Sequence, residues 1–181
     1  DLQEALSYCQ GVIEKRSTLP ILSNVLLDAS NSNLTITATD LDLIFIHKIN
    51  NVEIVEEGKT TTTSSIMFDI VRKFSSDKKI NLSMNNDSKL QLESEKSIFN
   101  LNCISYSEFP LTEENFNQNE FIINSKHFLK LLNKCKFSVS NDETRHYLSG
   151  IYLHQTEVDD KIYLTAVATD SHRMSISKIR L

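Results

Sequence analysis

Apolar residues recur along this chain with two different periods, and each period predicts one kind of element. Three segments repeat apolar side chains every three or four positions, which is the spacing of one helix face. They begin at Leu2, Ile66 and Phe128, and the second follows the candidate N-caps Ser64 and Ser65. The side chains expected to face inward are Leu2, Leu6 and Cys9 in the first segment, Ile66, Met67, Ile70, Val71 and Phe74 in the second, and Phe128, Leu131, Leu132 and Cys135 in the third.

Between these segments the chain alternates or is β-branched over short runs, which predicts antiparallel strands joined by polar turns. The predicted strands are residues 25–27, 34–38, 43–49, 80–84, 90–92 and 98–104. Another strand, residues 121–124, is expected to lead into the third helix. The order of helix, three strands, helix and three strands predicts an α+β fold built from β-meanders.

The chain also contains an internal repeat. Residues 34–40 return as residues 164–170, displaced by 130 positions, with five identities in seven. Upstream, residues 22–27 match residues 148–153 at a displacement of 126, and the first and third helical patterns match at the same displacement. The drift of four positions predicts a longer hairpin loop in the second copy. One structural unit is therefore expected to occur twice.

The repeat and a polar stretch suggest where the domains divide. Glu108-Phe109-Pro110 and the polar residues 112–120 are typical of a linker. We therefore expect one domain over residues 1–116 and the beginning of a second over residues 117–181. The second contains one helix and about three strands, which is half of the first domain's pattern. By the same pattern, a strand that precedes the first helix is expected to have been removed from the start of the chain.

Composition places the chain among ordinary soluble proteins. It has 181 residues, of which 40% are hydrophobic, and no apolar stretch is long enough to span a bilayer. No leader sequence is visible, so a cytoplasmic location is expected. Cys9, Cys103 and Cys135 are odd in number and far apart, which favours free buried thiols over disulfides.

The net charge of −5 argues against a protein that coats nucleic acid over its whole surface, but the charges are segregated. Lys126, Lys130 and Lys134 recur every fourth residue opposite the apolar stripe of the third helix. Arg72 is expected to face outward on the second helix, and Arg16 follows the first. The acidic residues cluster elsewhere, at Glu53, Glu56, Glu57, Glu93, Glu95, Glu108, Glu113 and Glu114. The alternative is that the lysines only solvate their helix.

No catalytic, metal or cofactor site is visible. The three glycines, Gly11, Gly58 and Gly150, are too far apart for a phosphate-binding loop or a dinucleotide fingerprint. The five histidines show no metal-ligand spacing. Asp40 and Asp170 end equivalent strands, and their repetition favours a turn role over acid–base catalysis.

Two segments contain residues that are typical of a functional site. Arg145-His146-Tyr147, expected at the start of a strand, joins a cation to aromatic rings in a way that suits nucleic acid. A cross-strand ion pair with a packed tyrosine is the alternative. The second place is residues 169–174, where the repeat diverges from residues 39–43. A turn whose residues differ in only one copy of a repeat is typical of a functional site acquired by that copy. A solvated turn without a function is the alternative.

Four segments, together with the strand end Ala38-Thr39-Asp40, resemble the bacterial sliding clamp family, the beta subunits of DNA polymerase III. They include residues 16–24, Glu108-Phe109-Pro110, residues 145–150 and residues 168–173. The resemblance covers the whole chain. It implies the DNA-clamp fold, in which helices line the inner face and sheets lie outside. It identifies residues 1–116 with the clamp amino-terminal domain and residues 117–181 with the first half of its middle domain. The carboxy-terminal domain is then absent from this chain.

The resemblance also implies a function. Clamp subunits form a head-to-tail homodimer ring around double-stranded DNA, without reading sequence, and tether the replicative DNA polymerase to it. Such a protein confers processivity and has no active site, cofactor, metal or membrane partner. It is cytoplasmic and nucleoid-associated during replication. A different class remains open, namely a non-enzymatic peptide-binding adaptor that does not encircle DNA.

Two sets of site residues follow. The DNA-binding set combines the basic helix faces with positions that resemble family contacts: Arg16, Arg72, Lys126, Lys130, Lys134, Arg145, His146 and Tyr147. Ser65 and Asp142 depart from the family pattern, so weaker DNA contact is expected. The second set resembles one wall of the groove that holds a short linear peptide from polymerases, the clamp loader and repair factors: Leu148, Thr169, Ser171, His172, Arg173 and Met174. The opposite wall lies outside this sequence, so weak peptide binding is expected.

Overall fold

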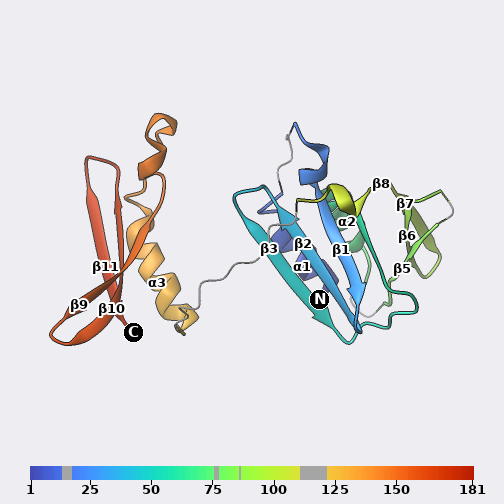
Figure 1. The fold of residues 1–181 in the computed structure, drawn as a ribbon, viewed down its shortest axis with the longest axis horizontal. Coiled ribbons are helices and arrows are strands. Elements are labelled where there is room, and N and C mark those ends of the chain that lie inside the picture. Colours follow the sequence, from blue (N-terminus) through green and yellow to red (C-terminus); the bar gives the residue numbers. More distant parts are fainter. Residues whose placement is uncertain (14–17, 76–77, 86, 111–121) are drawn as a thin grey trace. The chain divides into compact units, whose positions relative to one another are not determined.

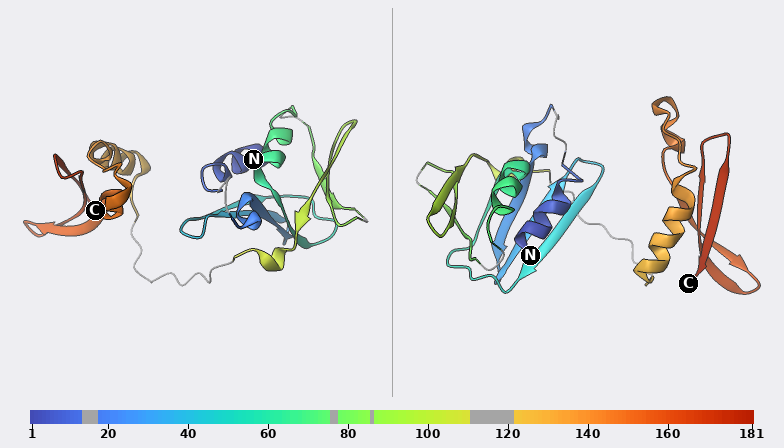
Figure 2. Two further views of the ribbon diagram at one scale, coloured as in Figure 1. Left: turned by 90° about the horizontal axis from the view of Figure 1, so that it is seen from above. Right: turned by 180° about the vertical axis from the view of Figure 1, so that it is seen from behind.

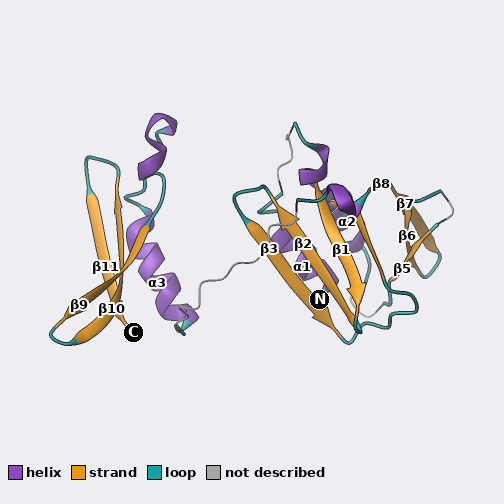
Figure 3. Ribbon diagram, in the orientation of Figure 1, coloured by secondary structure: helices purple, strands orange, loops and turns teal. Residues whose placement is uncertain are grey.

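The computed structural model describes residues 1–13, 18–75, 78–85, 87–110 and 122–181 (Figure 1). The chain divides into two compact units, Asp1–Glu113 and Glu114–Leu181. Each unit combines α-helix with antiparallel sheet, as the α+β prediction requires (Figure 3). No helix in these described ranges has both the length and the apolarity needed to cross a bilayer.

The described part of the first unit contains two α-helices and two sheets. A five-stranded sheet has the order β3-β2-β1-β4-β8, and a three-stranded sheet has the order β5-β6-β7. In chain order the elements are α1 (Leu2–Cys9), β1 (Asn24–Ser30), β2 (Asn33–Thr39), β3 (Ile44–Asn50), β4 (Gly58–Thr63), α2 (Ser64–Val71), β5 (Asn81–Met84), β6 (Leu90–Ser94), β7 (Ser97–Leu101) and β8 (Cys103–Ile104), with 3₁₀-helices η1 (Pro20–Ser23) and η2 (Tyr106–Glu108).

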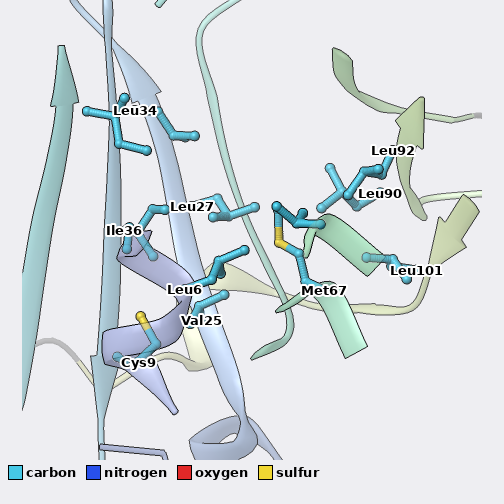
Figure 4. Packing of buried hydrophobic residues seen from close by; sticks show 14 of the residues in the cluster. Leu6, Cys9, Val25, Leu27, Leu34, Ile36, Met67, Leu90, Leu92 and Leu101 are labelled. Atoms are coloured by element: carbon cyan, nitrogen blue, oxygen red, sulfur yellow. The ribbon is translucent and has the colours of Figure 1, made fainter. Parts of the chain in front are cut away.

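The core of this unit lies between the helices and the sheets. Helices α1 and α2 contact each other and cover one face of the five-stranded sheet (Figure 2). Figure 4 shows the buried side chains that meet there: Leu6, Cys9, Val25, Leu27, Leu34, Ile36, Met67, Leu90, Leu92 and Leu101. Full burial of each aliphatic side chain contributes about 1.5–3 kcal/mol. The inward positions predicted for the first helix are confirmed, with Leu6 and Cys9 buried and Leu2 partly buried.

Helix α2 differs from the prediction at its start. It begins at Ser64, and Thr63 is the N-cap residue without a side-chain capping bond, so the expected capping role of Ser64 and Ser65 is wrong. Ile66 is 51% exposed rather than inward-facing. The buried positions are Ser64, Met67 and Val71, which share one face, and Ile66 lies about 100° around the helix from Met67.

Strand β4 was not predicted, because its threonines are polar. Thr61 and Thr62 are nevertheless buried, and their hydroxyls donate to the backbone oxygens of Ile104 at 2.7 Å and Asn102 at 3.1 Å. A buried hydroxyl with a partner costs little, so β-branched threonine serves as a core strand residue here. The single strand predicted over residues 98–104 is two strands, since β7 pairs with β6 and β8 pairs with β4.

The second unit repeats half of this architecture. Its elements are α3 (Ser125–Lys136), the 3₁₀-helix η3 (Glu143–Leu148), β9 (Tyr152–Val158), β10 (Lys161–Thr169) and β11 (Met174–Arg180). The sheet order is β11-β10-β9, and α3 packs on β10 and β11. The strand predicted over residues 121–124 is wrong for residues 122–124, whereas residue 121 lies outside the described residues. Asn124 instead caps α3, and its Oδ1 accepts hydrogen bonds from the backbone of Lys126 and His127.

The internal repeat is confirmed by strand pairing, but the longer loop is wrong. Leu27 pairs with Ile36 as Leu153 pairs with Ala166, and Thr39 pairs with Ile44 as Thr169 pairs with Met174. Both hairpins turn through two residues with positive φ, Asn31-Ser32 at 50° and 59° and Asp159-Asp160 at 50° and 57°. The four additional residues therefore lengthen the two arms by two residues each.

Candidate nucleic-acid interface and peptide groove

The three lysines of the third helical pattern lie on the exposed face of α3. Lys126, Lys130 and Lys134 are all exposed, while Leu131 and Cys135 on the opposite face are buried. The prediction that the apolar stripe faces inward is confirmed, since Phe128 and Leu132 are partly buried on that side. Helix spacing therefore places three positive charges on one solvent-facing ridge.

The buried face fixes the direction of this ridge. The Cys135 thiol donates to the backbone oxygen of Ala166 at 3.4 Å, and Leu131 packs with Leu164 and Ala168 of β10. Burial raises the pKa of Cys135, and in the equivalent position of α1 it raises the pKa of Cys9 to about 11. Both thiols therefore act as small apolar core groups, and the prediction of free cysteines is confirmed.

Helix stability explains only part of the lysine pattern. Cations near a helix carboxyl end interact favourably with the helix dipole, by about 0.3–1 kcal/mol, which accounts for Lys134 and Lys136 in the last turn. Lys126 lies in the first turn, where the dipole disfavours a cation. A basic face that continues into that turn therefore needs a reason beyond stability of the helix.

Arg145-His146-Tyr147 lies in η3 and not at the start of a strand, so that expectation is wrong. Asp142 causes the difference, because its Oδ1 accepts hydrogen bonds from the backbone and the hydroxyl of Thr144 at 3.0 and 2.6 Å. Its Oδ2 accepts from Nε of Arg145 at 2.8 Å. These bonds lower the pKa of Asp142 to about 2, the largest contributions coming from the Thr144 hydroxyl and the Arg145 guanidinium.

The aromatic residues of this segment are open to solvent. His146 is exposed, and 75% of Tyr147 is accessible, with the two rings edge to face at a centroid separation of 6.5 Å. Arg145 is partly buried, and its Nη1 also donates to Oγ of Ser171 at 2.9 Å. The rings are thus available to a partner, whereas the guanidinium is already held by Asp142 and Ser171.

The basic residues of the first unit are less concentrated. Arg72 is exposed after α2, where its guanidinium pairs with Asp69 at 3.0 Å and lies 5.8 Å from the ring of Phe68. Lys73 is exposed beside it. Arg16 lies outside the described residues.

The candidate groove residues centre on the turn between β10 and β11. Oδ1 of Asp170 accepts hydrogen bonds from the backbone of His172 and Arg173 at 3.0 and 2.9 Å. The Thr169 hydroxyl donates to the backbone oxygen of Arg173 at 2.7 Å and accepts from the backbone of Ser171 at 3.2 Å. The bonds to the backbone of His172 and Arg173 lower the pKa of Asp170 to about 2.

Asp40 performs the same task in the first unit. Its Oδ1 accepts from the backbone of Asp42 and Leu43 at 3.1 and 2.7 Å. The predicted turn role of Asp40 and Asp170 is therefore confirmed. The residue after each Asp has positive φ, 83° at Leu41 and 76° at Ser171. The two turns therefore have the same backbone conformation at this residue and differ in their side chains.

The outer side of this turn is exposed. Met174 is 63% accessible, and His172 and Arg173 are exposed. The Arg173 guanidinium pairs with Asp170 at 2.8 Å and lies 5.6 Å from the ring of Phe137 at the end of α3. Leu148 is partly buried in η3, and the Arg145–Ser171 hydrogen bond joins that helix to the turn.

Sequence reasoning missed the partners that hold these cations. Asp142, Asp170 and Asp69 each pair with an arginine three positions later. The Asp-x-x-Arg spacing was visible in the sequence and was a usable signal, whereas the contact between Arg173 and Phe137 was not. No group of three potential metal ligands comes together within the described ranges.

Comparison with known proteins identifies the family. Residues 1–113 match the family model for the DNA polymerase III beta subunit, N-terminal domain, and residues 122–181 match that for its central domain. The chain belongs to the DNA polymerase III beta subunit family. The resemblance inferred from sequence motifs is thereby confirmed.

Individual relatives support the assignment to the beta subunit family. The chain is 34% identical to the beta sliding clamp of Caulobacter vibrioides over 98% of its length, and 36% identical to that of Rickettsia felis over 99%. It covers 48% and 46% of those proteins, so it spans about half the length of the relatives it matches.

Solved beta subunit structures share the fold. The chain matches the Caulobacter crescentus beta sliding clamp with a TM-score of 0.93 at 33% identity, and the Bartonella birtlesii sliding clamp bound to griselimycin with a TM-score of 0.92 at 35% identity. These matches cover 99% of this chain and 48% of each structure.

Proposed function

We propose that the protein to which this chain belongs is a ring-forming DNA sliding clamp. It tethers the replicative DNA polymerase to double-stranded DNA and confers processivity, as an accessory subunit with no active site of its own. In this proposal residues 1–116 form the clamp amino-terminal domain and residues 117–181 form the first half of the middle domain. The ring is a head-to-tail homodimer, and the protein works in the cytoplasm on the nucleoid.

The exposed lysine ridge of α3 is the observation that carries the proposal. Lys126, Lys130 and Lys134 project from a helix whose opposite face is fixed on the sheet. Such side chains attract phosphates without reading bases. Each phosphate contact contributes about 0.9 to the slope of log affinity against log salt, so the attraction depends on salt and not on base sequence. Contacts of this kind permit sliding.

The negative net charge is compatible with this role. The total is −5, but at physiological salt the Debye length is about 8 Å, so acidic residues farther from the ridge are largely screened. His146 and Tyr147 add exposed rings near a second cation, Arg145. We assign these residues to DNA contact together with Arg72 and Arg16.

Partner proteins are proposed to bind through a short linear peptide at the turn between β10 and β11. Met174 offers an exposed apolar surface, and His172 and Arg173 border it. Burial of apolar peptide anchors contributes roughly 25 cal/mol per Å². Polymerase, clamp loader and repair factors would compete for this site.

Charge reversal of the ridge tests the clamp function. In the whole protein, the triple variant K126E/K130E/K134E should lose retention on nicked circular DNA and load poorly, and its salt slope should fall by about 0.9 for each lost phosphate contact. The matched control is K48E/K96E/K161E, which reverses three exposed lysines of β3, the β6–β7 turn and β10. Both variants change the net charge equally, so only the position of the charges differs.

The control also separates the clamp from a peptide-binding adaptor. An adaptor that does not encircle DNA would respond equally to both triple variants, with unchanged DNA retention and unchanged peptide binding. Equal retention of the ridge variant and the control on circular DNA would exclude the clamp function proposed here.

A further inference from the structure

The first unit contains a pocket that the proposed function does not use. Its volume is about 290 Å³. The lining combines η1, the β2–β3 turn and the segment around β8 and η2: Leu19, Pro20, Ile21, Leu22, Leu41, Ile104, Glu108 and Pro110. Seven of these eight residues are apolar, and the volume suits one or two side chains rather than a drug-sized molecule.

By the internal repeat, this pocket occupies the position in the first unit that is equivalent to the candidate peptide groove of the second unit. Leu22 corresponds to Leu148 at the displacement of 126, and Leu41 corresponds to Ser171 at the displacement of 130. The pocket is therefore built on the same backbone elements as the candidate groove.

The side chains at this place have opposite character in the two copies. Leu19 corresponds to Arg145 and Leu41 to Ser171, so the hydrogen-bonded pair of the second unit is replaced by two leucines that line the pocket. Leu19 and Leu41 are 50% and 55% exposed. Their apolar surface would leave water if a partner side chain entered.

Leu41 is retained at a conformational cost. Its φ of 83° lies in the left-handed region, which disfavours a side chain other than Gly, Asn or Asp by about 1–2 kcal/mol. A half-exposed leucine gains little from folding at that position. The cost is consistent with a contact that Leu41 makes only with a partner.

Among the described residues, the pocket has the carboxylates of Glu108 and Asp42 beside it, whereas at the matching turn of the second unit His172 and Arg173 stand beside Asp170. Glu108 is the charged residue of the lining, and it is exposed. Asp42 follows Leu41 where His172 follows Ser171, and Leu43 stands where Arg173 stands in the second unit. Charge complementarity therefore favours a cationic occupant.

We propose that this pocket is a second peptide-binding site, which takes a Leu or Phe anchor from a short segment that carries a flanking Lys or Arg. Leu41, Leu22 and Ile104 bury the anchor, and Glu108 pairs with the cation. The site differs from the groove of the second unit in the sign of charge that it prefers. It does not depend on DNA encirclement.

Two labelled peptides test the site in the 181-residue chain. The probes are the amidated hexapeptides Lys-Ala-Leu-Phe-Ala-Lys and Glu-Ala-Leu-Phe-Ala-Glu, followed by methyl NMR of Leu and Ile side chains. The basic peptide should shift the signals of Leu22 and Ile104 in a saturable way, and the acidic peptide should bind there several-fold more weakly. The Leu148 signal reports the second unit independently.

Three variants make the assignment specific. Leu41→Ser, which copies Ser171 and so suits this backbone, should weaken the basic peptide at the pocket by about tenfold. Glu108→Lys should reverse the preference between the peptides, by about threefold each. Val55→Ser, which removes an exposed apolar side chain outside the lining, should change neither.

Several outcomes would overturn the proposal. Shifts confined to Leu148, absence of shifts at Leu22 and Ile104, or equal binding of both peptides to the Glu108→Lys variant would each do so. Concentration-dependent shifts without peptide would show that a second copy of the chain occupies the pocket, which also contradicts the proposal. Loss of DNA retention in the ridge variant is a separate measurement, so this site and the clamp function can fail independently.

Discussion

Nη1 of Arg145 donates a hydrogen bond of 2.9 Å to Oγ of Ser171, and this bond joins the segment proposed to contact DNA to the turn proposed to hold partner peptides. The same guanidinium pairs with Asp142 through Nε at 2.8 Å. Arg145 is therefore shared between two candidate sites, and a phosphate that recruited it would compete with both internal partners.

A double-mutant cycle should measure this link. Arg145→Ala and Ser171→Ala remove the two ends of the bond, and their coupling in the free energy of unfolding should be about 0.5–1 kcal/mol. Chemical denaturation of the second unit gives the four values. The pair Arg145→Ala and Ser177→Ala, which shares no hydrogen bond given by the structure, is the control and should show coupling near zero. Equal coupling in both cycles would contradict a specific bond.

Stability should depend on pH through two carboxylates. Asp142 and Asp170 have folded-state pKa values lowered to about 2, below the unfolded value near 3.9. A lowered pKa stabilises the fold above the unfolded value, and this stabilisation disappears as the pH falls from about 4 through about 2. Urea denaturation between pH 2 and 7 should show the loss. Asp142→Asn and Asp170→Asn should flatten that curve, and an unchanged curve in both variants would show that other groups cause it.

The two-residue hairpin turns offer a simple gain in stability. Ser32 and Asp160 occupy the second turn position with φ of 59° and 57°, where glycine is favoured. Ser32→Gly and Asp160→Gly should each raise the free energy of unfolding by about 0.5–1 kcal/mol, because relief of strain exceeds the added chain entropy. Thermal denaturation measures the change. Alanine at the same positions should give no gain, and a gain with alanine would disprove the role of backbone strain.

The cysteines should differ in reactivity. Cys9 and Cys135 are buried, and burial raises both pKa values, so neither supplies an accessible thiolate at neutral pH. Cys103 is only partly buried. Iodoacetamide followed by peptide mass spectrometry should label Cys103 first in the native chain and all three residues in urea. Native labelling of Cys135 ahead of Cys103 would contradict the packing of α3.

Much of this fold could be predicted because the same structural unit occurs twice in the chain. The shared strand end at Thr39-Asp40 and Thr169-Asp170 was readable from identities alone, and the hydrogen bonds of both aspartates follow from their position after a strand. The outward direction of the α3 lysines followed from periodicity, because a helix that buries one stripe must expose the opposite one.

Two of the errors have a common physical origin, since both involve polar side chains whose hydrogen-bond partners the sequence pattern did not indicate. Strand β4 was missed because the acceptors of the Thr61 and Thr62 hydroxyls, the backbone oxygens of Ile104 and Asn102, lie 43 and 40 positions away. Arg145 was assigned to the start of a strand, although the hydrogen bonds of Asp142 hold the segment in two short 3₁₀ turns that meet at a kink at Arg145. The pocket around Leu41 joins elements separated by a long stretch of chain, which no local pattern reveals.

The β9–β10 hairpin has longer arms than the β1–β2 hairpin, so the two copies of the repeat differ at this end. Two more residues per arm, at about 3.4 Å each, carry the Asp159-Asp160 tip about 7 Å beyond the point where the shorter hairpin turns. That tip bears two exposed carboxylates, whereas the shorter one ends in the uncharged Asn31 and Ser32. A polyanion that approached either hairpin end-on would meet carboxylates: those of Asp159 and Asp160 within the longer turn, and that of Glu57 at the shorter one, whose Oε1 accepts a hydrogen bond from the backbone of Asn31 at 2.9 Å.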